Sequence, residues 1–206
     1  MTTLCGTIKK VLRMEMKDKI LPAITPESRK KQSYAITERV IGTDDFKKAQ
    51  TISIYLSTST EVDTTNLLTE MFQQGKKVFV PTYNKNVMEM VKLDSMLDYE
   101  SLPLTKWNIK QPNISDGREN ALTCGGIDLF IVPGVAFSRK GGRLGHGMGF
   151  YDKYFKRHSE TYPDKKSILM AIAFKEQIVP VTELPLAEHD VILDYVVTQD
   201  DVFSSK

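Results

Sequence analysis

The chain has few of the residues on which disulfide-rich and zinc-dependent proteins rely. Its 206 residues include two cysteines, Cys5 and Cys124, and three histidines, His146, His158 and His189. Two cysteines are too few for a disulfide framework, and the histidines never occur at metal-ligand spacing. The composition therefore argues against a catalytic zinc, and it is typical of a protein in a reducing, cytoplasmic compartment.

A strong charge of one sign and a long apolar run are also missing. The formal net charge is +2, which gives no electrostatic case for a nucleic-acid partner. The longest nearly uncharged stretch, residues 121–138, contains Asp128, Pro133 and Gly134, so it favours a buried strand and its exit loop over a membrane span. Charge begins at Lys9, so no signal-peptide core is expected. We expect a monomer with one domain, residues 1–206, because this length suits one core.

Three well-known catalytic and nucleotide-binding motifs are absent as well. No Gly-Lys-Ser/Thr phosphate loop occurs, no Gly-x-Gly-x-x-Gly follows a strand, and no Gly-x-Ser-x-Gly elbow is present. Cys124 lies beside glycines just before an apolar stretch, with no evident base to activate its thiol. The sequence therefore gives little support for a nucleophilic side chain.

The most informative stretch that is present runs from Gly141 to Asp152, GGRLGHGMGFYD. Its glycines precede an aromatic pattern with helical spacing, so the stretch predicts a glycine-rich loop that leads into a helix. Backbone amides at a helix N-terminus attract phosphate, and Arg143 adds a charged fork that matches phosphate oxygens. Asp152 then stands in the first helical turn, where it is either a ligand for the Mg²⁺ of a nucleotide or an ordinary helix cap. A flexible surface loop remains the alternative for the whole stretch.

Apolar spacing and capping residues predict four helices. The first covers residues 4–20 and is ended by Pro22, and the second begins after Thr25 and stops at Gly42. A third, at residues 64–74, is closed by Gly75, and a fourth covers residues 149–158. In the first helix, Lys9 and Arg13 share a basic face that is either solvated or a binding surface.

Short β-branched or apolar runs predict strands at residues 52–56, 77–81, 88–93, 127–132, 168–173 and 192–197, the last of which closes the chain. Their alternation with helices predicts an α/β fold, a single three-layer domain with a mixed, mainly parallel open sheet and helices on both faces. Ligands of such sheets bind beyond the carboxyl ends of the strands, where Leu56, Ser57, Glu61, Lys175 and Gln177 would lie. The segment 94–120 is expected to be loop-rich, and its Trp107 either plugs the core or forms a ligand platform.

The string Arg-Leu-Gly-x-Gly-x-Gly-aromatic-Tyr-Asp at residues 143–152 resembles the signature of the 5-formyltetrahydrofolate cyclo-ligase family. The similarity extends over nearly the whole chain. It includes the basic first helix and the segments ISIYLSTSTEV, LTKWNIKQP, GGIDLFIVPGVAF and AFKEQ.

The resemblance implies ATP- and Mg²⁺-dependent conversion of 5-formyltetrahydrofolate to 5,10-methenyltetrahydrofolate, with ADP and phosphate released. It implies Arg143 as the catalytic residue and Mg²⁺ bound by Asp152 and Asp190. The nucleotide would contact Lys9, Lys10, Arg13, Arg143, Leu144, Gly145, His146, Gly147, Met148, Gly149, Phe150 and Tyr151. The folate would contact Leu56, Glu61, Trp107, His146, Gly147, Met148, Gly149 and Phe150, with Glu61 hydrogen-bonded to the pterin. Met88 and Met90 are weaker candidates for a wall against the flat pterin, since most methionine stripes belong to a core.

Three positions depart from the family pattern. His146 and Met148 occupy slots where some relatives carry Arg or Lys, and Phe150 replaces the usual Tyr. A non-catalytic binding protein, another enzyme on an open α/β sheet and a nucleic-acid module remain as rival interpretations.

Overall fold

The computed structural model describes residues 2–84, 87–105, 109–187 and 190–205, and its centre is a seven-stranded sheet. The spatial order of the strands is β10-β9-β7-β4-β1-β2-β3. The five strands from β9 to β2 run parallel, whereas β10 and β3 are antiparallel to their neighbours at the two edges. The strands are β1 (Thr51–Ile54), β2 (Lys77–Asn84), β3 (Val87–Leu93), β4 (Leu129–Val132), β7 (Ile168–Ile172), β9 (Tyr195–Val197) and β10 (Val202–Ser204).

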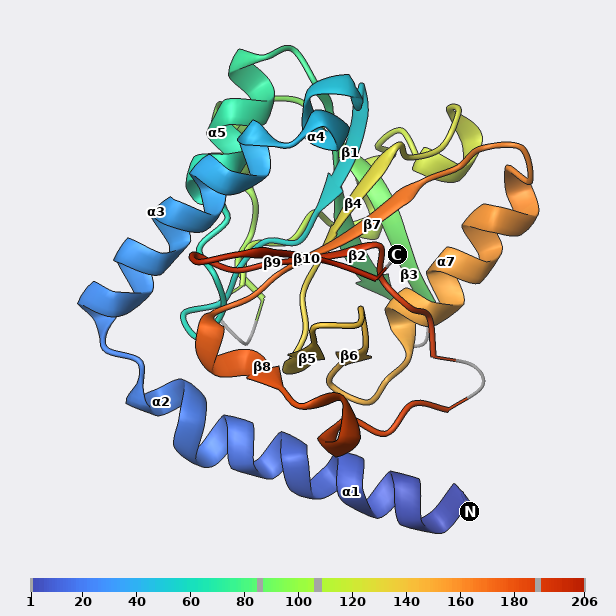
Figure 1. Cartoon of the computed structure of the whole chain (residues 1–206). Helices are drawn as coiled ribbons and strands as arrows, with labels where there is room; N and C mark the ends of the chain where they lie inside the picture. The colour runs from blue at the N-terminus through green and yellow to red at the C-terminus, as the bar shows by residue number, and fades with distance from the viewer. Residues whose placement is uncertain (1, 85–86, 106–108, 188–189, 206) are drawn as a thin grey trace.

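Helices cover both faces of this sheet, as Figure 1 shows. The strand β4 is apolar at every position because its alternate side chains enter different cores. Leu129 and Ile131 pack with α3 (Pro26–Gly42), α4 (Asp44–Lys48) and α5 (Thr65–Gln73) on one face. Phe130 and Val132 pack on the other face with α7 (Phe150–Thr161). The expected three-layer, mainly parallel α/β fold is confirmed.

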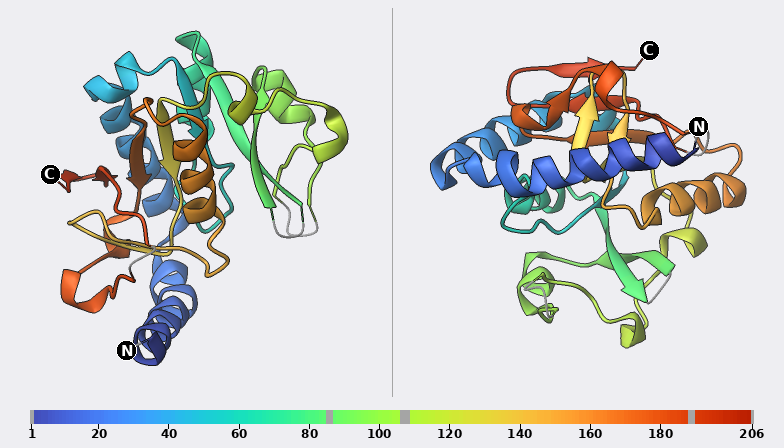
Figure 2. Two further views of the ribbon diagram at one scale, coloured as in Figure 1. Left: turned by 90° about the vertical axis from the view of Figure 1, so that its right-hand side faces the viewer. Right: turned by 90° about the horizontal axis from the view of Figure 1, so that it is seen from below.

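A second, smaller sheet and the first helix lie beyond the carboxyl ends of the parallel strands (Figures 1 and 2). The small sheet consists of β6 (Arg143–Leu144), β5 (Ala136–Ser138) and β8 (Ile178–Val179) in that order. It packs against Leu12 and Met16 of the first helical segment, which comprises α1 (Thr2–Glu15), the π-helical turn η1 (Met16–Ile20) and α2 (Leu21–Ala23). Two short 3₁₀ turns, η4 (Lys175–Gln177) and η5 (Val181–Glu183), flank β8.

Two expected element ends were wrong. Pro22 does not end the first helix: it occupies an early position of α2, where its missing N–H costs little, and the chain becomes extended only at Ile24. The strand expected at residues 192–197 is only β9, because Leu193 instead donates its amide to the carbonyl of Gly141 at 2.9 Å. It is also not the last strand, since β10 follows it as an antiparallel edge.

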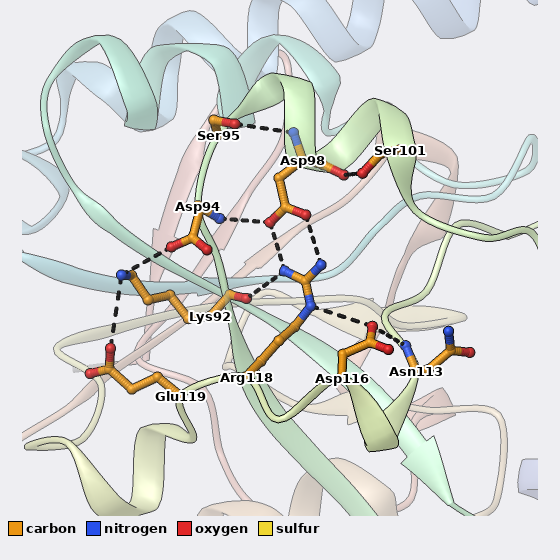
Figure 3. Close-up of polar contacts among 9 residues, drawn as sticks. All are labelled: Lys92, Asp94, Ser95, Asp98, Ser101, Asn113, Asp116, Arg118 and Glu119. Atoms are coloured by element: carbon orange, nitrogen blue, oxygen red, sulfur yellow. Dashed lines mark hydrogen bonds and ion pairs between the residues drawn. The ribbon is translucent and has the colours of Figure 1, made fainter.

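The segment 94–120 contains more structure than its composition predicted. It includes α6 (Met96–Ser101) and the 3₁₀ turn η2 (Ile114–Asp116), and a further 3₁₀ turn, η3 (Ala121–Thr123), follows it directly. Ser95 caps α6 by accepting the amide of Asp98 at 3.0 Å, and Asp98 pairs with Arg118 (Figure 3). The Ser-x-x-Asp spacing is a helix-start signal that the sequence interpretation overlooked.

Within the described ranges, no helix is long and apolar enough to cross a lipid bilayer.

Candidate active site

The glycine-rich stretch forms a loop between β6 and α7. Strand β6 pairs with β5 and thereby fixes Arg143 and Leu144 at the carboxyl edge of the main sheet. A Cβ atom at Gly145 would lie 3.1 Å from Nη1 of Arg143, a tight contact that would force the guanidinium to shift by a few tenths of an ångström. Gly147 has a φ of 103°, which is strained for any side chain. The N-cap of α7, Gly149, provides no side-chain cap, which leaves the amides of the first turn available to an anionic ligand.

Arg143 is almost completely buried beneath this loop, with 6% of its side chain exposed. Its Nη2 donates to Oδ2 of Asp152 at 2.9 Å, and its Nη1 donates to the carbonyl of Pro133 at 3.4 Å. The guanidinium carbon lies 5.4 Å from the centre of the Tyr151 ring. Its Nε is buried without an acceptor among the described residues, a donor that an anionic ligand could satisfy.

Helix α1 reaches the same loop with two cations. Arg13 donates from Nε to the carbonyl of Gly145 at 2.7 Å. Lys9 forms an ion pair with Asp190, and both side chains are mostly buried, at 14% and 15% exposed. Lys10, by contrast, is exposed and does not line the cavity described below. The basic face of the first helix is therefore a surface directed at the loop through Lys9 and Arg13, rather than a purely solvated one.

The two aspartates expected to bind metal, Asp152 and Asp190, both accept hydrogen bonds from backbone amides of the segment 187–191. Oδ1 of Asp152 accepts the amide of Val191 at 3.5 Å, directly after Asp190, and Oδ2 of Asp190 accepts the amide of Ala187 at 2.7 Å. The carboxylate of Asp152 thus faces Arg143 and the 190–191 segment rather than capping α7.

A cavity of about 2030 Å³ joins this loop to the carboxyl ends of β1 and β2. Leu56 and Glu61 follow β1 and line the cavity, together with Tyr83 of β2. Oε2 of Glu61 accepts the amide of Thr58 at 2.9 Å, and Oε1 lies 4.0 Å from Nε2 of His146, whose side chain is 72% exposed. The loop after β1 therefore presents a carboxylate to the cavity.

Aromatic rings line the cavity between this carboxylate and the glycine loop. The centre of the Tyr83 ring lies 5.1 Å from that of Phe150, with the rings tilted by 57°. Burial of its hydroxyl end raises the pKa of Tyr83 to about 12, with a smaller contribution from the charge of Glu61. Burial likewise raises the pKa of Tyr151 well above its usual value. Both tyrosines are therefore neutral hydrogen-bonding groups at physiological pH.

The comparisons with known proteins agree on one family. The model of the 5-formyltetrahydrofolate cyclo-ligase family matches residues 6–199. This chain belongs to that family. The 5-formyltetrahydrofolate cyclo-ligase of Mus musculus is 43% identical over 200 residues, which cover 95% of each chain. A protein of Caenorhabditis elegans named as a probable 5-formyltetrahydrofolate cyclo-ligase is 34% identical over 196 residues, 94% of each chain. The solved structure of a 5,10-methenyltetrahydrofolate synthetase from Aquifex aeolicus superposes with a TM-score of 0.77 at 26% identity, over 97% of this chain and 93% of that one.

The resemblance and the expectation of a cyclo-ligase enzyme are thereby confirmed. In the structure of this cyclo-ligase, most of the residues expected at the site lie together. The cavity is lined by Lys9, Arg13, Leu56, Glu61, Arg143, Leu144, Gly145, His146, Gly147, Met148, Gly149, Phe150, Tyr151, Asp152 and Asp190. Trp107 lies outside the described residues. The roles of these residues remain predictions, because only their positions are established.

Four of the other candidates lie elsewhere. Met88 and Met90 are 2% and 0% exposed within the core beneath α7, so they form no cavity wall. They fail as candidates because alternate residues of β3 face that core rather than the strand ends. Gln177 is buried and donates to the carbonyls of Gly134 and Val135 at 2.8 and 3.2 Å, a structural role, and neither it nor Lys175 lines the cavity.

Sequence reasoning missed Tyr83, and from the segment that forms one cavity wall it named only Trp107 and none of the lining residues Thr105, Ile109, Lys110 and Gln111. A signal for Tyr83 was available, since it stands at the carboxyl end of the parallel strand β2, and ligands bind at such ends. The wall residues had no such signal, because their position depends on tertiary contacts of an irregular segment.

Proposed function

We propose that this cyclo-ligase converts 5-formyltetrahydrofolate to 5,10-methenyltetrahydrofolate with ATP and Mg²⁺, through a phosphorylated formyl group. One observation carries the proposal. A single cavity contains, at one end, a glycine loop with three basic side chains and, elsewhere, a carboxylate beside aromatic rings. The first arrangement suits polyphosphate, and the second suits a flat heterocycle with hydrogen-bond donors. The names of the mouse and Aquifex aeolicus relatives fit the same substrate and product.

The chemistry requires an amide oxygen to become a leaving group. The formyl oxygen attacks the γ-phosphorus of ATP, and ADP leaves, which gives an iminium phosphate. The bridge nitrogen then attacks the formyl carbon and loses its proton, and inorganic phosphate departs with the former formyl oxygen. Such transfer depends on positioning and charge neutralisation, so it needs no nucleophilic side chain. Cys124 is not expected to act as a nucleophile. Burial raises the pKa of its thiol to about 11 and keeps it protonated, and a protonated thiol is unreactive.

The residues of the loop would supply these functions. Arg143 and the amides of Gly145, Gly147 and Gly149 would hold the phosphates, and Lys9 and Arg13 would offset their charge. Lys9 would have to leave its partner Asp190 for the phosphates. Glu61 would accept a hydrogen bond from the pterin, while Phe150 would pack against its ring.

The carboxylates of Asp152 and Asp190 fit Mg²⁺ better than a metal ion whose ligands all come from protein side chains. Among the residues that the structure describes, no group of three His, Cys, Asp or Glu side chains could hold a metal ion. Mg²⁺ commonly takes one or two carboxylates and completes its octahedron with water and phosphate oxygens. When bound, it would neutralise charge on the transferred phosphoryl group.

Oxygen labelling tests the proposed intermediate directly. The protein would be incubated with ATP, Mg²⁺ and 5-formyltetrahydrofolate carrying ¹⁸O in the formyl group, while the methenyl product is followed by its absorbance. We expect one labelled phosphate for each product formed. Product formation with unlabelled phosphate would refute the phosphorylated formyl group, and the absence of ATP-dependent product would refute the proposed reaction and favour a non-catalytic binding protein.

A reducing compartment such as the cytoplasm is the location that we propose. Both cysteines are free thiols. Free, partly buried thiols suit such a compartment.

A further inference from the structure

One wall of the active-site cavity belongs to the segment between α6 and η2. Its described residues Thr105, Ile109, Lys110 and Gln111 line the cavity. The two arms of this segment pair with each other: the amide of Thr105 donates to the carbonyl of Ile109 at 2.8 Å, and that of Gln111 donates to the carbonyl of Pro103 at 3.1 Å. Because its two arms are hydrogen-bonded to each other, we expect the wall to move as one unit. Its position then depends on the contacts that hold the segment to the rest of the protein.

Lys110 attaches this wall to α6. Its ammonium donates to the carbonyls of Tyr99 and Glu100, at 3.0 and 2.5 Å, near the C-terminal end of that helix. It also lies 5.0 Å from the centre of the Tyr99 ring. A cation at a helix C-terminus is favourable because unpaired carbonyls gather there. A second attachment is made by Thr82 of β2, whose hydroxyl donates to the carbonyl of Pro112 at 2.8 Å.

Arg118 in turn attaches α6 to the main sheet (Figure 3). Its two terminal nitrogens donate to the two carboxylate oxygens of Asp98 on α6, at 2.6 and 2.7 Å. Nη1 also donates to the carbonyl of Lys92 on β3 at 3.1 Å. Both side chains of the pair are 17% exposed, and Arg118 lowers the pKa of the Asp98 carboxyl. A two-bonded fork of this kind fixes orientation as well as distance.

We propose that Arg118 and Asp98 are positioning residues for the folate substrate, acting through α6 and Lys110 on the cavity wall. Neither residue lines the cavity, so their effect is transmitted along this chain of contacts. The inference rests on the proposed function, because it takes the wall to face the folate. The glycine loop and its basic side chains are attached to other elements, so the pair should affect folate without affecting ATP.

The variants Arg118→Ala, Arg118→Lys, Asp98→Asn and the double variant Arg118→Ala/Asp98→Asn test the inference. We expect the folate KM to rise about fivefold or more in Arg118→Ala, which is the size of a typical coupling between contacting groups. Arg118→Lys should have a smaller effect, because it keeps one of the two bonds. Asp98→Asn leaves one acceptor oxygen and so removes one of the two bonds, whereas Arg118→Ala removes both. The double variant should therefore be no worse than Arg118→Ala alone. The KM for ATP should stay within about twofold of wild type in all of them.

Arg157 provides a matched control. It pairs with Glu89 at 2.8 Å and donates to the carbonyl of Met88 on β3 at 3.3 Å, yet it joins α7 rather than α6 to that strand. Arg157→Ala should leave the folate KM close to that of wild type, because the buried face of α7, with Tyr154, Phe155 and His158, holds this helix on the sheet without the ion pair. If Arg118→Ala does not fold, Arg118→Lys and Asp98→Asn carry the test.

A wild-type folate KM in these variants would overturn the inference, and so would an equal rise for folate and ATP. Equilibrium binding of folate to the same variants keeps the two proposals separate. A wild-type protein that binds folate but forms no product contradicts the proposed reaction, while the ratio of folate dissociation constants between wild type and variants still decides the role of the pair.

Discussion

Arg143 donates from Nη2 to Oδ2 of Asp152 at 2.9 Å, so the residue expected to bind phosphate and a residue expected to bind metal are partners of each other. Lys9 and Asp190 form a second pair of the same kind. In each pair an uncompensated buried charge is avoided when no ligand is present. Binding of a phosphate–metal complex would give each cation an anion and each carboxylate a cation, so the exchange keeps the site neutralised.

Replacement of Arg143 tests the phosphate end of the cavity. We expect Arg143→Ala to weaken ATP binding by about 2–5 kcal/mol, the cost of losing one partner of a buried charged contact. The folate KM should change far less, and Arg143→Lys should be intermediate because an ammonium lacks the planar fork. The KM of each substrate and the turnover number are the measurements. An unchanged KM for ATP with unchanged turnover would remove Arg143 from the site. Arg139→Ala, at an exposed position four residues earlier, is the control.

The aromatic pair at the cavity tests the folate end. Tyr83→Ala should raise the folate KM several-fold, because it removes the ring that packs against Phe150. Tyr83→Phe keeps the ring and should stay close to wild type, and neither change should alter the KM for ATP. Equal defects in the Ala and Phe variants would show instead that the hydroxyl matters.

Local signals in the sequence indicated six of the seven strands of the main sheet, and only the edge strand β10 was not predicted. The apolar run at 127–132 and the β-branched run at 52–56 predicted the strands β4 and β1, and Gly75 follows α5 with a φ of 68°, as its position after the apolar pattern predicted. The small sheet β6-β5-β8 was not predicted. All three of its strands have only two or three residues, too few for periodicity to show, and their pairing depends on tertiary contacts.

The residues of the candidate site also fall into those that a local sequence signal revealed and those that it did not. Arg143 and the glycines could be found because a phosphate loop has a local composition, and Leu56 and Glu61 because they follow a parallel strand. The link from Arg118 through Asp98 to Lys110 could not be found, since its members are separated by stretches of irregular chain. Conversely, Met88 and Met90 were weak candidates because a methionine pattern does not reveal which face of a strand meets the core.

Asp128 provides a test of stability against pH. Burial raises its pKa, but the ion pair with Lys165 and hydrogen bonds from the amides of Thr51 and Gln50 outweigh burial and hold the pKa at about 2. A folded-state pKa below the unfolded value stabilises the fold above the unfolded pKa, and this contribution is lost as the pH falls through the folded one. Asp128→Asn should therefore cost about 1–2 kcal/mol at neutral pH. The difference from wild type should shrink between about pH 4 and pH 2.

Urea unfolding of both proteins at several pH values measures this difference. Asp164→Asn, at an exposed acid in the turn before Lys165, should unfold like wild type throughout. A gap between Asp128→Asn and wild type that is the same at neutral and acidic pH would mean that the charge of Asp128 contributes nothing.

The role of Asp152 can be decided by removing its charge while its shape is kept. Asp152 accepts from Nη2 of Arg143 with Oδ2 and from the amide of Val191 with Oδ1. The single amide oxygen of Asn can keep the bond with Arg143 and loses the longer one with Val191, so Asp152→Asn should reduce the stability of the fold by only about 1 kcal/mol. If the carboxylate holds Mg²⁺, turnover should fall strongly and recover in part when Mg²⁺ is raised, because weaker binding is offset by concentration. If it serves only to orient Arg143, the loss should be small and independent of Mg²⁺. Asp190→Asn distinguishes the two carboxylates: since Asp190 pairs with Lys9, its loss should raise the KM for ATP–Mg²⁺ more gently. Wild-type turnover of Asp152→Asn at low Mg²⁺ would exclude Asp152 as a metal ligand and leave it as the residue that positions Arg143.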